Sequence, residues 1–138
     1  MTEKDKELLL KDLCARLPYG VKISIPDLWT QKREIEILDE IFKGDDGLYR
    51  VNSKGQCIEH IRPYLFPLSS MTEEQKREYE DTLVYHDYTK GGWTIAKTFN
   101  DEYVIPYWFV DFCNKNHLDY RGLIPKGLAI DCTNLNTY

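Results

Sequence analysis

The sequence lacks the features that direct a chain out of the cytoplasm or into a membrane. Its first ten residues, MTEKDKELLL, carry charge from the start and contain no apolar stretch of signal-peptide length. The longest apolar run, over residues 103–110, is far too short to span a bilayer. We therefore expect a cytoplasmic protein with no membrane partner.

Clustered positive charge is also missing. Lys and Arg number 18 against 23 Asp and Glu, which gives a net charge of −5, and no block of five like charges occurs. Duplex nucleic acid is held by clustered Lys and Arg against its phosphates, so binding to a duplex is not expected. Single-stranded nucleic acid stays open as an alternative, because aromatic residues make up 13% of the chain and bases stack on such rings.

Motifs for catalysis and cofactor binding are scarce as well. No G-x-S-x-G motif occurs, and the glycines form neither a G-x-G-x-x-G fingerprint nor a P-loop. The four cysteines are scattered at wide intervals, which favours reduced thiols over a disulfide framework. These absences favour a protein that is not an enzyme without deciding the question, and they predict no cofactor.

One metal-binding alternative remains. Cys57 and His60 are spaced C-x-x-H, and Cys113 and His117 are spaced C-x-x-x-H. Two Cys and two His can build a tetrahedral zinc site, and the second pair would share one face of a helix. However, Cys113 lies among aromatic residues typical of a core. We therefore expect no metal and keep these four residues as the alternative.

The first half of the chain predicts one helix followed by strands. A chain of 138 residues fits a single domain, residues 1–138, with a core of its own. Residues 2–17 carry apolar side chains at helical spacing behind a capping Thr2. Residues 21–25 alternate and predict a half-buried strand, and the alternation returns from residue 34 with Ile35 and Ile37. The stretches KGDDG and NSKG predict hairpin turns.

The second half predicts helices that pack on the sheet. Two prolines around residues 64–66 force an extended path, and Ser70 or Thr72 caps a following helix. Pro106 begins a helix to about residue 116 that is apolar on nearly all sides, so we interpret it as the central helix. Residues 127–131 predict a last short strand. The predicted fold is α+β: a small antiparallel sheet of three to five strands, an N-terminal helix and two later helices.

The stretch HLDYRGLIPKG, which follows the last helix, has two interpretations. It is a structural corner if Asp119 pairs with Arg121 and Tyr120 packs its ring. It is a binding site if Arg121, together with Arg62, grasps an anionic group or a carboxylate of a partner. A small hydrolase with its site at Asp119 and Arg121 is a further alternative. The candidate binding residues are Arg62, Tyr64, Asp119, Tyr120 and Arg121.

Three stretches together resemble a known group of proteins: KDLCARLPYGVK, IRPYLFPLSSMTEEQK and HLDYRGLIPKGLAI. They resemble an uncharacterised family of small proteins from gut anaerobic bacteria and their phages and mobile elements, over roughly a third of the chain. The resemblance carries no catalytic residue and implies an accessory factor of a mobile element. We therefore expect a non-catalytic binding protein that engages a host or defence protein, with Trp29, Tyr64 and Tyr88 among its contact residues.

Overall fold

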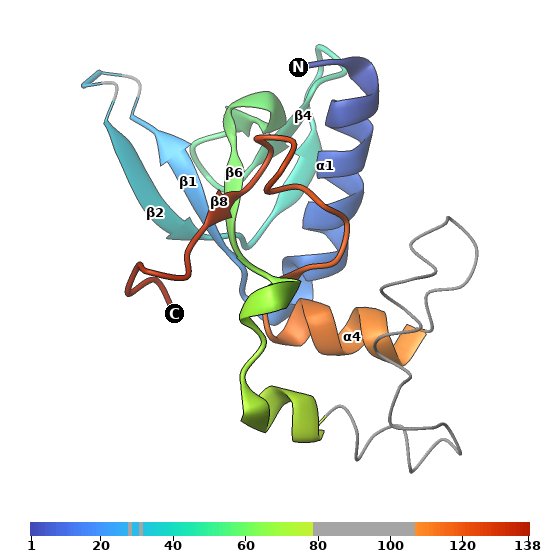
Figure 1. The fold of residues 1–138 in the computed structure, drawn as a ribbon. Helices are drawn as coiled ribbons and strands as arrows, with labels where there is room; N and C mark the ends of the chain where they lie inside the picture. The colour runs from blue at the N-terminus through green and yellow to red at the C-terminus, as the bar shows by residue number, and fades with distance from the viewer. Residues whose placement is uncertain (28, 31, 79–106) are drawn as a thin grey trace.

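The computed structural model describes residues 1–27, 29–30, 32–78 and 107–138, and its fold is α+β, as the sequence predicts (Figure 1). A further helical turn, residues 73–78, precedes the longest undescribed stretch. The elements follow in this order: α1 (Glu3–Arg16), η1 (Leu17–Tyr19), β1 (Lys22–Pro26), β2 (Arg33–Ile37), β3 (Ile41–Lys43), β4 (Tyr49–Val51), β5 (Gln56–Cys57), η2 (Ile58–His60), β6 (Arg62–Pro67), η3 (Leu68–Ser70), α4 (Tyr107–Lys115), β7 (Leu118–Asp119) and β8 (Ile130–Asp131).

Helix α1 begins and ends where the sequence predicts. Thr2 and Asp5 form a reciprocal cap: the Thr2 hydroxyl accepts the Asp5 N–H at 3.1 Å, and the Asp5 carboxylate accepts the Thr2 N–H at 3.2 Å. The helix ends before Pro18, and Gly20 takes a left-handed φ of +67° that turns the chain into β1. Leu9 and Leu13 are fully buried on one side of α1, so the predicted amphipathic helix is confirmed.

The strands form two sheets. The larger has five strands in the order β2-β1-β6-β7, with β8 also paired to β6, and the smaller has three in the order β3-β4-β5. The pairs β1–β2 and β1–β6 are antiparallel, whereas β7 and β8 both run parallel to β6. The expected sheet was antiparallel throughout. The parallel pairs arise because β7 and β8 follow α4 and come back to the central strand β6 from the far end of the chain.

The main core lies between α1 and the inner face of the sheets. It is formed by Leu9, Leu13, Val21, Ile23, Ile25, Leu38, Val51, Ile58, Ile61, Leu65, Leu123, Leu128 and Ala129. Helix α4 contributes none of these described residues, so its interpretation as the central helix is wrong. It lies instead across the C-terminal end of α1 (Figure 1) and builds a second apolar cluster. That cluster is formed by Met71, Phe109, Phe112, Cys113, Leu118 and Tyr120.

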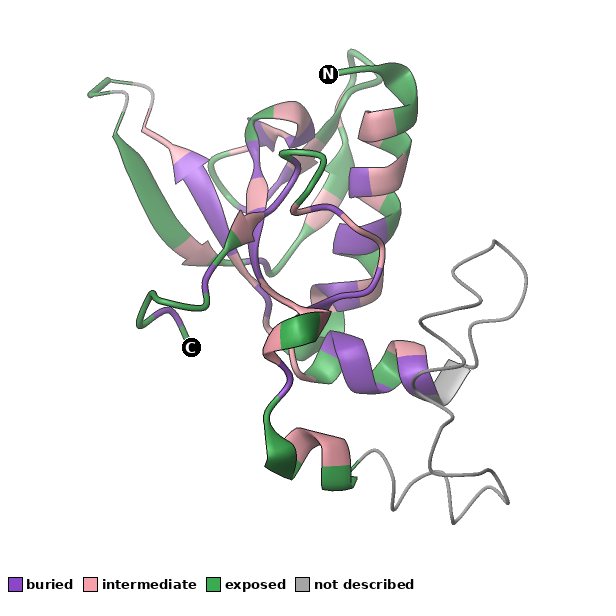
Figure 2. Ribbon diagram, in the orientation of Figure 1, coloured by how far each residue is buried: buried purple, intermediate pink, exposed green. Residues whose placement is uncertain are grey.

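Strand β1 is buried on both faces rather than on one. Its inner face carries Ile23 and Ile25, and on its outer face Ser24 is also fully buried. Ser24 is covered by the side chain of Arg33, whose Nε donates to the Ser24 hydroxyl at 2.6 Å. The expectation of a half-buried strand fails because β1 lies between β2 and β6 (Figure 2), so a long side chain from the neighbouring strand covers the polar position.

The helix expected at Ser70 or Thr72 begins at Thr72. The Thr72 hydroxyl accepts the N–H of Gln75 at 3.1 Å, and the Gln75 side chain accepts the N–H of Thr72 at 2.9 Å. Its first turns reach α4 through a bond of 3.3 Å from the Gln75 amide to the Asn116 side chain. The remainder of this predicted helix and the candidate contact residue Tyr88 lie outside the described residues.

Ile23 of β1 and Ile35 of β2 test which face of the larger sheet is buried and which is open. Ile23→Ala removes a fully buried side chain, and we expect it to lower the free energy of unfolding by about 2–5 kcal/mol. Ile35→Ala removes a side chain that is 55% exposed, and we expect a change of less than about 1 kcal/mol. Chemical denaturation measures both. Equal losses for the two variants would contradict the assignment of Ile35 to an open face.

Candidate functional site

Of the two interpretations of the residues after α4, the contacts of Asp119 support the structural corner. Asp119 is buried, and its two carboxylate oxygens accept the N–H groups of Leu123 at 2.8 Å and Ile124 at 2.9 Å. The expected pair with Arg121 is not formed, since Arg121 Nη1 lies 3.6 Å from an oxygen of Asp12 on α1. Because both Asp119 oxygens hold the turn, this carboxylate is not free to act on a substrate.

Tyr120 packs in a buried polar cluster at the end of α1. Its ring lies between two guanidinium groups, 5.2 Å from that of Arg16 and 4.8 Å from that of Arg121. Arg16 is fully buried, and its Nε donates to Asp12 at 2.8 Å while Nη2 donates to the Leu118 carbonyl at 2.7 Å. Burial raises the pKa of the Tyr120 hydroxyl. Tyr120 is therefore part of the core packing and is not a surface contact.

Six buried polar side-chain atoms near this end of α1 have no hydrogen-bond partner within the part of the chain that the structure describes. They are Asp12 Oδ1, Arg16 Nη1, Asn114 Oδ1, His117 Nδ1, Tyr120 OH and Arg121 Nη1. Two of these atoms, Asp12 Oδ1 and Arg121 Nη1, face each other as an ion pair at 3.6 Å. Arg16 joins α1 to β7 through its bonds to Asp12 and to the Leu118 carbonyl.

The four metal-ligand candidates are not brought together. Among the described residues, which include all four, no group of three or more His, Cys, Asp or Glu could hold a metal ion. Cys57 lies on β5 and His60 is exposed at the end of η2, whereas Cys113 is buried in α4. Burial raises the pKa of the Cys113 thiol far above its usual range, and His117 stacks on the Tyr138 ring at 3.9 Å. The predicted zinc alternative is therefore wrong.

The open surface of the molecule is the outer face of the five-stranded sheet. Residues directly opposite each other on antiparallel strands share a face, and Ser24 is opposite both Ile35 of β2 and Arg62 of β6. The outer face therefore carries every second residue from these positions. They are Lys22 and Ser24 of β1, Arg33, Ile35 and Ile37 of β2, and Arg62, Tyr64 and Phe66 of β6.

Only part of this face is open to a partner. The C-terminal residues cover its β6 side: the Tyr138 hydroxyl donates to the Tyr64 carbonyl at 2.9 Å, and the Tyr138 ring lies 5.9 Å from that of Phe66. Tyr64 is buried, so its expected role as an exposed contact is wrong, although Arg62 beside it remains on the face. Trp29, on the loop that leads to β2, is 94% exposed.

Three cations on the outer face have no carboxylate partner among the described residues. Arg33 donates to the Ser24 hydroxyl and carbonyl and to the His60 carbonyl, the last at 2.8 Å. Arg62 donates only to backbone carbonyls, and Lys22 donates to the Thr137 carbonyl. None of the three forms an ion pair within the part of the chain that the structure describes. Burial lowers the pKa of Arg62, and the charge of nearby Arg33 adds to this shift.

Strand β2 forms an edge of this face that pairs with no further strand among the described residues, although its Ile37 carbonyl accepts a hydrogen bond from the Asn52 side chain at 2.9 Å. It is the terminal strand of the sheet, and Ile35 and Ile37 are each 55% exposed (Figures 1 and 2). The inner side of the strand is polar, since Lys54 lies 3.0 Å from Glu34 and 3.6 Å from Glu36. The sequence could not identify this surface, because alternation ordinarily places the apolar side chains of a strand toward the core, and here Ile35 and Ile37 face outward.

Comparison with protein-family models, curated proteins and solved structures finds no match to this chain. Within the described residues, no helix has the length and apolar character needed to cross a membrane.

The buried Asp12–Arg16 pair can be tested by separating its two members. We expect Asp12→Ala to lower the free energy of unfolding by about 3–5 kcal/mol, because Arg16 then stays buried without its charge partner. The double change Asp12→Leu with Arg16→Met removes both charges, and we expect it to recover most of that loss. Denaturation curves of the single and double variants measure the coupling. A double variant no more stable than Asp12→Ala would contradict this account of the pair.

His117 makes stability depend on pH. Burial lowers the pKa of His117 to about 4, and the charges of Arg16 and Lys22 act in the same direction. An unfolded histidine titrates near pH ~6.5, so between these values the unfolded state binds more protons and stability falls as the pH falls. We expect the wild type to lose more free energy of unfolding between pH 7 and pH 5 than His117→Asn does.

Asn suits position 117 because the backbone there has a φ of +57°, a conformation that Asn tolerates well. The control is His60→Asn, at an exposed histidine at the end of η2. The control should keep the wild-type pH dependence. If His117→Asn loses as much free energy of unfolding between pH 7 and pH 5 as the wild type does, burial of His117 does not cause the pH dependence.

Proposed function

We propose that this protein is a non-catalytic binding protein that engages a partner protein at the β2 edge of its outer sheet face. The observation that carries the proposal is the combination of an edge strand with two isoleucines that are each 55% exposed. An unpaired edge offers backbone N–H and C=O groups to an incoming strand, and exposed apolar side chains beside it add contact area. Partner proteins commonly dock by extending a sheet in this way.

The positive charge on the outer sheet face indicates which kind of partner segment can bind there. Lys22, Arg33 and Arg62 bond neutral oxygens and form no ion pair within the described residues. A partner strand with apolar side chains toward Ile35 and Ile37 and acidic side chains toward the cations is complementary to this face. The partner is therefore an extended segment whose two faces differ in side-chain type, with acidic side chains on the face that continues the outer face of the sheet.

Two alternatives from the sequence find less support. Base stacking needs exposed aromatic rings beside the cations. This face offers Tyr138, which is 44% exposed with Lys22 5.5 Å from its ring, and Trp29 on the loop before β2, whereas Tyr64 is buried. Single-stranded nucleic acid therefore stays the second candidate, behind the apolar β2 edge. A hydrolase at Asp119 and Arg121 needs a free carboxylate, and both Asp119 oxygens are bonded to backbone. The resemblance to small proteins of mobile elements remains a prediction, and it suggests a host or defence protein of gut anaerobic bacteria as the partner.

Affinity capture with matched variants tests the proposed function. The tagged protein is incubated with a gut-anaerobe lysate, with and without phage infection, beside the double variant Ile35→Ser, Ile37→Ser. We expect a protein retained by the wild type to be retained about tenfold less by the double variant, because contacts at the centre of an interface carry most of the binding energy. Higher salt should weaken retention, since the face is cationic.

The control is Leu135→Ser, at a side chain that is 48% exposed in the C-terminal residues. It should retain the partner as the wild type does. Equal retention by the double variant, or no retained protein at all, would contradict the proposed function. Retention that disappears after nuclease treatment would favour the single-stranded nucleic-acid alternative instead.

A further inference from the structure

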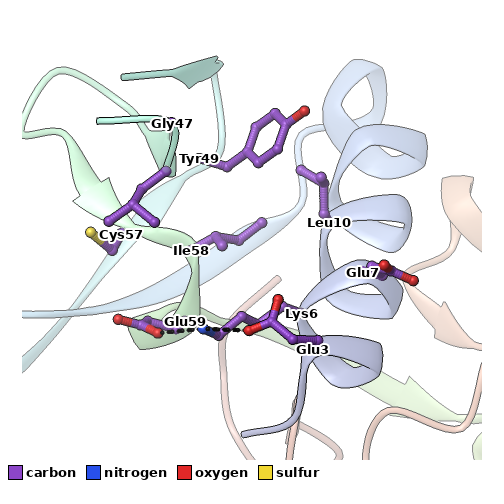
Figure 3. A pocket seen from close by; sticks show the side chains of 10 residues that line it. Glu3, Lys6, Glu7, Leu10, Gly47, Tyr49, Cys57, Ile58 and Glu59 are labelled. Carbon is purple, nitrogen blue, oxygen red and sulfur yellow. Dashed lines mark hydrogen bonds and ion pairs between the residues drawn. The ribbon is translucent and has the colours of Figure 1, made fainter. Parts of the chain in front are cut away.

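A pocket lies between α1, the β3–β4 hairpin and η2 (Figure 3). It is a pocket of about 270 Å³ lined by Glu3, Lys6, Glu7, Leu10, Gly47, Leu48, Tyr49, Cys57, Ile58 and Glu59. Ile58 belongs both to this pocket and to the main core, so the pocket is the open end of the cleft in which α1 packs on the sheets.

The pocket exists because two lining positions fail to fill it. One turn before Leu10, α1 carries Lys6, whose amine is held at the rim by Glu3 and Glu59, at 3.3 Å from each. On the hairpin side Gly47 has no side chain, and its φ of +81° is a conformation that disfavours any other residue. Leu48 and Tyr49 beside it remain 48% and 38% exposed, which leaves apolar surface uncovered at the mouth.

The walls and the rim of the pocket differ in chemistry. The walls are apolar, formed by Leu10, Leu48, Ile58 and the Tyr49 ring. The rim carries three carboxylates against the single amine of Lys6, and among the described residues Glu7 forms no ion pair. A further cation, Lys43, lies over the Tyr49 ring at 5.8 Å and is not among the lining residues. The pocket therefore combines an apolar interior with a net negative mouth.

We propose that this pocket receives one bulky apolar side chain of a partner protein whose neighbouring residue is Lys or Arg. The volume favours a single side chain, because pockets for free drug-sized ligands run from about 300 to 1,000 Å³. The net negative rim, with Glu7 unpaired within the described residues, favours a cation next to the apolar group. This inference stands apart from the proposed function, whose surface is cationic and lies on the outer sheet face.

Three small peptide probes test the inference on the full chain. Amide resonances of the protein are followed by NMR while N-acetyl-Phe-Arg-amide, N-acetyl-Phe-Glu-amide and N-acetyl-Gly-Arg-amide are added in turn. We expect saturable shifts with the first probe, confined to residues 3–10, 47–49 and 57–59. The second probe meets like charge and the third has no apolar group, so we expect each to bind at least about tenfold more weakly.

Two matched charge reversals test whether the Glu7 carboxylate contributes to binding of the Phe-Arg probe. Glu7→Lys should weaken the Phe-Arg probe about tenfold, whereas Glu74→Lys, at an exposed residue remote from the pocket lining, should leave its affinity unchanged. Leu48→Ser, which removes an apolar wall and keeps the charge, should weaken it as well. The same spectra report whether each variant is folded.

Four results would overturn the proposal: no saturable shifts, shifts centred on β2 rather than the pocket, equal binding of the Phe-Glu probe, or Glu7→Lys behaving as Glu74→Lys does. Saturation at the pocket with the stated charge preference supports it. Apart from shifts centred on β2, these outcomes do not involve the β2 edge, so failure of the pocket proposal would leave the proposed function to its own test.

Discussion

The buried side chain of Arg16 joins the two apolar clusters of this protein. It is fully buried, bonded to Asp12 within α1 and to the Leu118 carbonyl of β7, and it lies over the Tyr120 ring. A guanidinium removed from water needs these partners in fixed directions, so α1 can dock against β7 in only one rotation about its axis. Since Leu118 pairs with Phe66, that constraint passes directly to the central strand β6.

This docking of α1 determines which surfaces stay open. The helix covers the inner face of the large sheet, and the C-terminal residues cover the outer face near β6, so the β2 edge is left uncovered. Acidic and basic side chains of β1 and β2 also lie on different faces of the large sheet. Glu34 and Glu36 turn to the inner side near Lys54, while Arg33 remains on the outer face with Lys22. The net charge of −5 thus conceals a cationic face and a pocket with an acidic rim.

Local patterns in the sequence predicted the elements, and contacts between distant residues decided the rest. The Thr2 cap, the glycine turns and Pro106 act within a few residues, so α1, the hairpins and the helix after Pro106 could be predicted. The role of Asp119 depends on the N–H groups of a turn that it reaches only after the chain has folded. The open face of β2 could not be predicted either, because alternation ordinarily places apolar side chains toward the core, whereas Ile35 and Ile37 face outward and Glu34 and Glu36 face Lys54.

An exposed edge strand invites pairing between copies, and the inner side of β2 opposes it. If two copies paired antiparallel about Ile35, with their isoleucines on one face, Glu34 of one copy would be opposite Glu36 of the other. Like charges directly opposite are unfavourable, and each Lys54 already bonds the Glu34 of its own chain. A partner strand with neutral or basic residues on its inner side avoids this repulsion. The alternation of β2 therefore limits the sequence of a partner strand on both of its faces. Its outer side should carry apolar and acidic side chains, and its inner side should carry no acidic ones.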